Sequence, residues 1–332
     1  MKGAALLYKK SLKIRDLTLR NRIVMPPMAS RKGDPDGQIN DAVIEHYAKR
    51  TESGKLGLVI VEHSCVNVQG KVRSSMLSLA DDVMLEGHKR LTDCIHAAGT
   101  PVIAQINHCG ALSDPAATGM PVIAPSAVVN PGDQKGSVPA AMAVEEIDRL
   151  VDDFAEAAVR AMKAGYDGVE VHSAHGYLLN QFYSPLTNKR EDAYGCGSIE
   201  DRLRVHRRVL QAVREVIGSV PLFLRLGGCD YIPGGTTVDD TVQAAPLLES
   251  YGIDLLDISG GLNGYTIPGH TEPGYFREIT DAVRNKVHIP LILTGGVKTA
   301  DQAEQLLQDH AADLIGIGRA IYADPGWAAE NL

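Results

Sequence analysis

The chain has 332 residues, of which 44% are hydrophobic and 22% are charged, and its formal net charge is -8 at pH 7. These proportions are typical of a soluble globular protein and exclude the apolar-poor composition of a disordered chain. The negative balance also disfavours a nucleic-acid partner, which would require a basic face to displace counterions from its phosphates, so small-molecule chemistry is favoured.

The N-terminal segment lacks the pattern of a secretion signal. Its apolar run at 4–7 is too short for a signal-peptide core, and no later stretch approaches the length of a membrane span. Alternating Leu12, Ile14, Leu17 and Leu19 favour short strands over a transit peptide. We therefore expect a cytoplasmic protein with no membrane partner.

The cysteines are dispersed singly along the chain. No Cys-x-x-Cys pair is present that could hold zinc or an iron-sulfur cluster, and an odd, scattered set suggests reduced thiols. The sequence therefore predicts no metal site formed by cysteine. The five residues are Cys65, Cys94, Cys109, Cys196 and Cys229.

Eight short apolar runs rich in Val, Ile and Leu predict buried parallel strands. Segments between them have helical periodicity, as in Ile147, Leu150, Val151, Phe154 and Ala158. Eight alternations without a break in composition predict an α/β protein with a (β/α)8 TIM barrel, in a single domain that spans 1–332. The runs are 22–27, 57–62, 101–106, 167–172, 221–226, 254–259, 290–295 and 313–318.

The connection after the third run, 107–143, departs from this regularity. It contains five prolines and several glycines, so it cannot form one helix. Long loops in compact domains are often lids or binding loops, and this one follows the carboxyl end of a strand, where active sites of such barrels assemble. We expect a long loop that covers a pocket.

Glycines follow both of the last two predicted strands. Gly295 and Gly296 precede Thr299 and Gln302, which form a capping box at the start of a helix, and Gly318 precedes Arg319. Glycines allow close approach of an anion to the backbone, and the loops after strands seven and eight of such barrels often bind phosphate. Tight turns without a ligand are the alternative, and we favour the phosphate site.

Three side chains that can exchange protons follow the fourth predicted strand. His172, His175 and Tyr177 fit hydrogen-bond donors to a substrate oxygen and a proton donor. A metal site formed by the two histidines with Glu170 has only a weak spacing signal. Histidines with a purely structural role are the third interpretation, and the residues alone do not decide between it and catalysis.

Two polar residues interrupt runs that should be apolar. Gln105 lies near the end of the third run and Arg225 near the end of the fifth. A buried arginine is costly unless it is paired, so Arg225 requires an anionic or electron-rich partner. A reduced flavin could be that partner, and a salt bridge with Asp257 is the alternative.

Ordered motifs over nearly the whole chain resemble the Old Yellow Enzyme family of FMN-binding barrels, of the NADH:flavin oxidoreductase type. They are Leu-Arg-Asn-Arg-Ile-Val-Met-Pro-Pro-Met at 19–28, His-Ser-Ala-His-Gly-Tyr-Leu at 172–178, Ser-Pro-Leu-Thr-Asn-Lys-Arg at 184–190 and Ala-Asp-Leu-Ile-Gly-Ile-Gly-Arg at 312–319. The resemblance implies tightly bound, noncovalent FMN.

The resemblance also implies a role for each candidate residue. The backbone at Pro27 and Met28 would contact the flavin, and His172 and His175 would bind the substrate oxygen while Tyr177 supplies a proton. The remaining cofactor-binding residues would be Gln105 and Arg225 at the pyrimidine edge, with Gly295, Gly296, Gly318 and Arg319 around the phosphate.

Within the family, the chain is most similar to a bacterial branch that includes 2,4-dienoyl-CoA reductase, whose longer members append iron-sulfur and FAD domains. We expect the native chain to continue, with clustered cysteines soon after 332. Ala29 stands where one subgroup has a cysteine, and Arg31, His63 and Cys196 also depart from the family pattern.

The expected function is an FMN-dependent ene-reductase. NADH or NADPH would reduce FMN, and hydride would then pass to the β-carbon of an alkene conjugated to a carbonyl. The alternatives are a flavin electron-transfer module of a larger iron-sulfur flavoprotein, and a flavin-independent barrel lyase that uses Lys298 with a phosphorylated substrate. The expected partner is a small molecule, and identical chains could assemble into an oligomer.

Overall fold

The computed structural model describes residues 6–133 and 136–332, and eight parallel strands in it form a closed barrel. Each of the eight predicted runs overlaps one of these strands, which confirms the (β/α)8 prediction. Around the barrel the order follows the sequence. The strands are β3 (Ile23–Met25), β4 (Leu58–Cys65), β5 (Val102–Asn107), β8 (Gly168–Ser173), β9 (Leu222–Gly227), β10 (Leu255–Ser259), β11 (Leu291–Thr294) and β12 (Leu314–Gly316).

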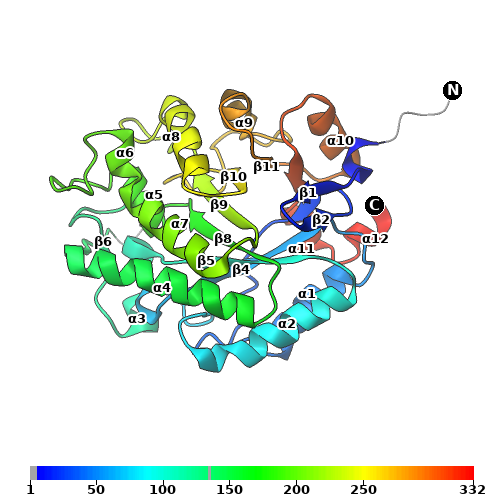
Figure 1. Cartoon of the computed structure of the whole chain (residues 1–332), viewed down its shortest axis with the longest axis horizontal. Helices are drawn as coiled ribbons and strands as arrows, with labels where there is room; N and C mark the ends of the chain where they lie inside the picture. Colours follow the sequence, from blue (N-terminus) through cyan, green and yellow to red (C-terminus); the bar gives the residue numbers. More distant parts are fainter. Residues whose placement is uncertain (1–5, 134–135) are drawn as a thin grey trace.

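A helix follows each barrel strand, and together these helices surround the barrel (Figure 1). The apolar stripe predicted from Ile147 to Ala158 lies on α4, and all five of its residues are buried. The eight helices are α1 (Asp41–Thr51), α2 (Leu85–Ala97), α4 (Val144–Lys163), α7 (Arg204–Ile217), α8 (Val238–Ser250), α9 (Arg277–Val283), α10 (Ala300–Gln308) and α11 (Arg319–Ala323).

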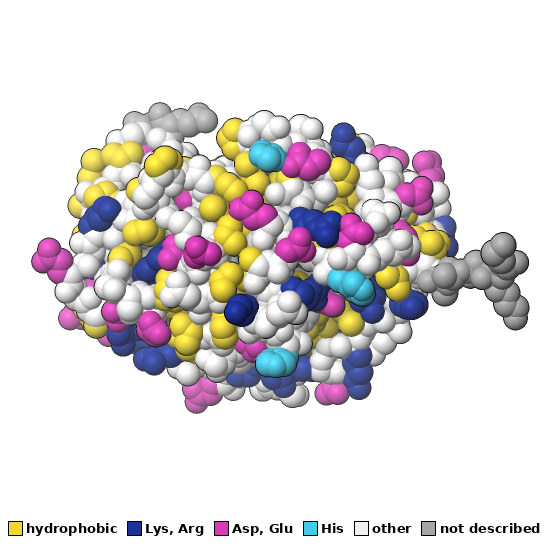
Figure 2. All heavy atoms as spheres, turned by 90° about the horizontal axis from the view of Figure 1, so that it is seen from above, with side chains coloured by type: hydrophobic (Ala, Val, Ile, Leu, Met, Phe, Trp, Pro, Cys, Tyr) yellow, Lys and Arg dark blue, Asp and Glu magenta, His cyan; other side chains and the backbone are white. Residues whose placement is uncertain are grey.

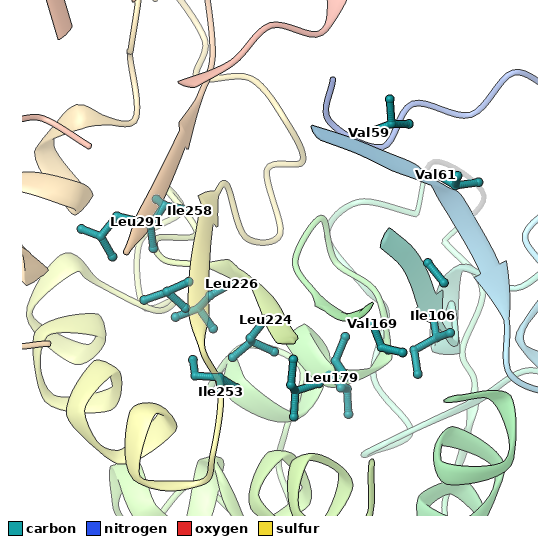
Figure 3. Packing of buried hydrophobic residues seen from close by; sticks show 14 of the residues in the cluster. Val59, Val61, Ile106, Val169, Leu179, Leu224, Leu226, Ile253, Ile258 and Leu291 are labelled. Carbon is teal, nitrogen blue, oxygen red and sulfur yellow. The ribbon is translucent and has the colours of Figure 1, made fainter. Parts of the chain in front are cut away.

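Alternation along the strands divides the apolar core in two, because successive side chains point to opposite faces. The larger cluster lies between the barrel and the helices, where residues such as Val169, Leu224 and Leu226 pack (Figure 3). A smaller cluster fills the barrel interior. It contains Val24, Leu58, Ile60, Ile103, Phe223, Leu255, Ile292 and Leu314.

A small hairpin closes the amino-terminal end of the barrel. Strands β1 (Leu12–Ile14) and β2 (Leu17–Leu19) pair antiparallel, which confirms the strands predicted there. Ile14 and Leu19 belong to the same packed cluster as the interior side chains. We call this interior cluster together with the hairpin the barrel floor.

The long connection between 107 and 143 contains only short elements, so the prediction that it is not one helix is confirmed. They are η4 (Gly110–Leu112), α3 (Pro115–Thr118), β6 (Ile123–Ala124) and β7 (Ala140–Ala141). The connection packs beside α5 (Leu178–Tyr183). There the Asn130 amide donates to the Gly176 carbonyl at 2.8 Å.

Short helices complete the described part of the chain. They are α6 (Ile199–Arg202), α12 (Trp327–Asn331), η1 (Leu7–Lys9), η2 (Val68–Gly70) and η3 (Asp82–Met84). None of the helices in 6–133 and 136–332 combines the length and apolar character that crossing a bilayer requires.

Candidate active site

A cavity of about 330 Å³ opens at the carboxyl ends of the barrel strands. Its volume lies in the range of roughly 300 to 1,000 Å³ that is usual for small-molecule sites. All eight strands or the loops that follow them contribute to its lining, so residues far apart in the sequence meet there. The cavity therefore occupies the place where active sites of such barrels form.

Every residue that the resemblance assigned to catalysis or to FMN binding lines this cavity. They are Pro27, Met28, Gln105, His172, His175, Tyr177, Arg225, Gly295, Gly296, Gly318 and Arg319. Arg31 and His63, which depart from the family pattern, line it too. Among the described residues, none of the long connection 107–143 does. Its role as a pocket cover stays a prediction.

A polar layer lies between the barrel floor and the cavity. Gln105 Nε2 donates to Glu170 Oε1 at 2.8 Å, and Arg225 Nε lies 3.2 Å from Asp257 Oδ2. Burial raises the pKa of both carboxyls, and the nearby Arg225 charge opposes that rise. Arg225 thus has the salt bridge that the sequence offered as an alternative, and its side chain also reaches the cavity.

The turn after β8 sets the positions of the two predicted catalytic histidines. His175 adopts a left-handed backbone conformation with φ 59°, and its N–H donates to the Gly260 carbonyl at 3.1 Å. Such a conformation is costly outside glycine and is held by its surroundings. It brings the His175 ring edge-on to His172, with 5.0 Å between ring centroids.

Hydrogen bonds determine which nitrogen of each histidine can face a ligand. His172 Nδ1 accepts from the Ala174 N–H at 3.2 Å, so the proton of the neutral ring lies on Nε2. His175 Nε2 lies 2.7 Å from Ser259 Oγ, which leaves Nδ1 for the cavity. Burial, followed by the nearby charges, holds the pKa of both rings well below its usual value. Both imidazoles are therefore neutral near pH 7.

Tyr177 completes this cluster of rings. Its ring meets His172 edge-on at 5.2 Å between centroids and stacks on His63 at 5.3 Å. Burial, above all, raises the pKa of its phenol. The phenol therefore keeps its proton at neutral pH and can act as a proton donor.

The predicted phosphate site is a backbone recess next to Arg319. Gly295 and Gly296 have φ values of 135° and 72°, and a Cβ on Gly295 would lie 2.7 Å from the Tyr275 ring. Arg319 Nη2 contacts the Tyr275 hydroxyl at 3.3 Å and has no acidic partner within the described ranges. Packing against Tyr275 alone explains the glycine at 295, so the glycines do not by themselves indicate a phosphate. The guanidinium of Arg319, which has no acidic partner among the described residues, is the feature that indicates an anion.

Two alternatives from the sequence gain no support. Lys298 is exposed and, in the part of the chain that is described, does not line the cavity. No group of three histidine, cysteine or acidic side chains within 6–133 and 136–332 is arranged to hold a metal ion. Glu170 is instead engaged by Gln105 in the polar layer.

Sequence reasoning missed several residues of the cavity wall. Arg73 follows β4, Tyr265 and Tyr275 follow β10, and Thr294 ends β11. Thr294 lies in the run 290–295, so alternation along that strand could have identified it. The others lie in loops without a motif, and only their position after predicted strands could have marked them.

The model of the NADH:flavin oxidoreductase / NADH oxidase family matches residues 9–330. An NADH oxidase from Thermoanaerobacter brockii is 36% identical, over 95% of this chain and 49% of its own length. An NADPH dehydrogenase from Halalkalibacterium halodurans is 38% identical, over 96% and 91%. The chain thus spans about half of the first relative and nearly all of the second.

Solved structures agree with these relatives. A 2-naphthoyl-CoA reductase in complex with 2-naphthoyl-CoA has a TM-score of 0.91 at 28% identity, covering 98% of this chain and 52% of its own. An Old Yellow Enzyme homologue from Zymomonas mobilis has a TM-score of 0.84 at 29% identity, covering 96% and 90%. These matches confirm the resemblance inferred from the motifs, and the chain belongs to the NADH:flavin oxidoreductase / NADH oxidase family.

Proposed function

We propose that the protein is an FMN-dependent ene-reductase that uses NADH or NADPH. The observation that supports this proposal is one cavity that is lined both by groups that suit a flavin and by a cluster of neutral rings that can donate hydrogen bonds or a proton. When bound, FMN supplies the hydride chemistry between the nicotinamide and the alkene.

The residues on one side of the cavity fit FMN. Thr294 Oγ1 is buried without a hydrogen bond, and the Arg225 side chain reaches the cavity while its Nε faces Asp257, so both residues can serve a polar ligand edge. A Cβ on Gly318 would lie 3.1 Å from the Met28 sulfur, which leaves little space for any larger residue. With Gln105 beside Arg225 and Arg319 beside Gly296, the pyrimidine edge and the phosphate would each meet suitable groups.

The histidine pair fits the stabilisation of negative charge on a carbonyl oxygen. Hydride addition at the β-carbon pushes electron density onto that oxygen. The proton on His172 Nε2 is fixed by the contact at Nδ1, so this donor is oriented before the substrate arrives. His175 Nδ1 becomes a second donor when Ser259 donates its hydroxyl hydrogen to Nε2.

Tyr177 fits the last requirement, a proton for the α-carbon. Its hydroxyl has no hydrogen-bond partner among the described residues, and its ring is held between His63 and His172. A neutral phenol in a largely buried site can give up a proton when a carbanion forms beside it.

Two competing functions remain to be separated by experiment. An electron-transfer module of a larger flavoprotein is consistent with the two relatives of which this chain covers only about half. Such a module would not require the cluster of His172, His175 and Tyr177 in the cavity. A lyase would not require a flavin at all. Cytoplasmic location and a small-molecule substrate complete our proposal, and assembly into an oligomer stays a prediction.

The proposal is tested with the purified protein under anaerobic conditions. We expect a yellow protein that releases FMN on denaturation, is bleached by NADH or NADPH, and recovers its colour when an enone such as 2-cyclohexenone is added. Bleaching without recovery by any enone would favour the electron-transfer module. A colourless protein that does not bind FMN would overturn the proposal.

A further inference from the structure

The charge of the cavity lining differs from that of the protein as a whole. Four arginines line the cavity, and no aspartate or glutamate does among the described residues. The chain nevertheless carries a net charge of -8, and acidic and basic side chains are interspersed on the face shown in Figure 2. The four are Arg31, Arg73, Arg225 and Arg319.

Two of these cations have their roles in the proposed flavin site. Arg225 is paired with Asp257, and Arg319 lies beside the glycine recess. Neither Arg31 nor Arg73 makes a hydrogen bond or an ion pair through its guanidinium in the described part of the chain, although the charge of Arg73 does act on the Glu62 carboxyl and lowers its pKa. The cavity therefore has two cations that the cofactor does not require.

Arg73 lines the cavity near Tyr177, because its neighbour Val72 and Tyr177 pack against the same small apolar cluster that contains Cys65, Met76 and Cys109. Its charge lowers the pKa of both Tyr177 and His63, although burial has the larger effect on each group. His63 is buried and Tyr177 is half-buried in the cavity wall, so the guanidinium acts near the site of proton transfer. It does not lie at a distant part of the surface.

The backbone of Arg31 is fixed in an unfavourable conformation. Its φ of 60° is in the left-handed region, where residues other than glycine are uncommon. The Glu62 carboxylate holds this turn, because it accepts hydrogen bonds from the Ser30 N–H at 2.9 Å and from the Arg31 N–H. Strain of this kind is concentrated at functional sites.

His63 adds a neutral donor next to the two cations. Asn107 Nδ2 donates to His63 Nδ1 at 3.0 Å, which places the ring proton on Nε2. That nitrogen makes no hydrogen bond within the described ranges and is not fully enclosed by protein, and the ring lines the cavity. Burial lowers the pKa of His63 to about 3, so the ring is neutral.

We propose that Arg73, Arg31 and His63 form a subsite for a carboxylate on the substrate, separate from the carbonyl oxygen that faces His172 and His175. This inference rests on the proposed function and names the substrate class, which is small enones that bear a free carboxylate. A guanidinium and an N–H donor suit the planar, two-oxygen form of a carboxylate. The phosphates of NADPH or of a coenzyme A thioester lie many bonds from the reacting carbon, whereas Arg73 acts next to Tyr177.

Binding is measured by titration calorimetry, with the protein as purified and two saturated ligands that cannot turn over. We expect 4-oxopentanoate to bind about 10- to 100-fold more tightly than its methyl ester, as charged hydrogen bonds provide. Arg73→Gln should remove this preference and Arg73→Lys should keep part of it. Arg149→Gln, on the exposed side of α4, is the matched control and should leave it unchanged.

Turnover provides the second comparison. The wild type should have a higher kcat/KM for 4-oxopent-2-enoate than for its methyl ester, and Arg73→Gln should equalise the two. Arg73→Gln should leave the rate of flavin reduction by NADPH unchanged. It should also leave unchanged the ratio of the rates for a coenzyme A thioester and for its N-acetylcysteamine analogue, which lacks the phosphates.

Three outcomes would overturn the subsite. They are equal binding of acid and ester by the wild type, an acid preference that survives in Arg73→Gln, and an effect of this variant confined to NADPH or coenzyme A. Failure of the proposed function would look different, because a protein without flavin or enone turnover could still bind the acid more tightly than the ester.

Discussion

The two ends of the barrel are built from the same strands but contain opposite kinds of side chain. At the amino-terminal end Phe223 and Leu255 point inward under the hairpin, and two residues further along the same strands Arg225 and Asp257 point inward. Apolar side chains stabilise the fold when they are buried, whereas buried charges cost free energy unless they are paired. The apolar floor therefore stabilises the fold, whereas the cavity end contains buried polar and charged side chains that cost stability but can bind a ligand and take part in a reaction.

The largest effect is expected when Tyr177 at the cavity end is replaced by phenylalanine. Tyr177→Phe should slow reoxidation of reduced flavin by an enone about 100- to 10,000-fold, because the proton donor is lost. Reduction by NAD(P)H should be unchanged, and a nitroalkene, whose product can leave unprotonated, should be spared. Stopped-flow measurement of both half-reactions provides the check, and equal slowing of the two would assign Tyr177 another role.

Mutations in the floor should lower the free energy of unfolding and have little direct effect on the reaction. Phe223 is fully buried, so Phe223→Ala should lower the free energy of unfolding by about 3 to 5 kcal/mol. The exposed Val216 on α7 is a control, and Val216→Ala should change the free energy of unfolding by less than about 0.5 kcal/mol. Denaturant titration measures both. If the folded Phe223→Ala protein lost enone reduction without loss of stability, the division between floor and cavity would be wrong.

Replacement of His172 should reduce activity strongly and stability only slightly, the reverse of the effect expected for Phe223. His172→Ala removes the oriented Nε2–H donor, and we expect a loss of about 100- to 1,000-fold in the enone half-reaction. The free energy of unfolding should change less than in Phe223→Ala. His172→Gln, which keeps a donor, should recover part of the rate. Undiminished enone reduction by His172→Ala would exclude this residue from the oxygen site.

The difference between the two ends should also appear in the pH dependence of stability. Burial raises the pKa of Glu62 to about 7, whereas the apolar cluster inside the barrel contains no ionisable side chain. The folded state thus binds this proton more tightly than the unfolded state, so the free energy of unfolding falls as pH rises from the ordinary carboxyl pKa through about 7. Glu62→Gln should reduce this fall between pH 5 and pH 8 in thermal melts. An identical fall in the variant would assign it to other groups.

Much of this contrast could be predicted from the sequence because it depends on local patterns. The eight apolar runs, the stripe on α4 and the spacing of His172, His175 and Tyr177 all report on residues that are close along the chain. The roles of the site residues stay predictions, because placement in one cavity does not show what each residue does.

Other features depend on contacts between distant segments. The sequence allowed Arg225 to pair with Asp257 or to face a flavin, and the structure has the pair at the edge of the cavity. Arg73 and Tyr275 reach the cavity through loops whose paths are set by tertiary packing. The tautomer of His63 depends on Asn107, which lies on a neighbouring strand. No local pattern encodes such a contact.

The central claim, that the cavity above the floor holds FMN, is tested most directly by titrating FMN into deflavinated protein and following the quenching of flavin fluorescence. We predict that Arg319→Ala weakens FMN binding by about 10- to 100-fold, since a charged contact to the phosphate is lost. Arg149→Ala, on the outer helix, should bind as the wild type does. Equal affinity of wild type and Arg319→Ala, or release of FAD in place of FMN from the purified protein, would contradict the account.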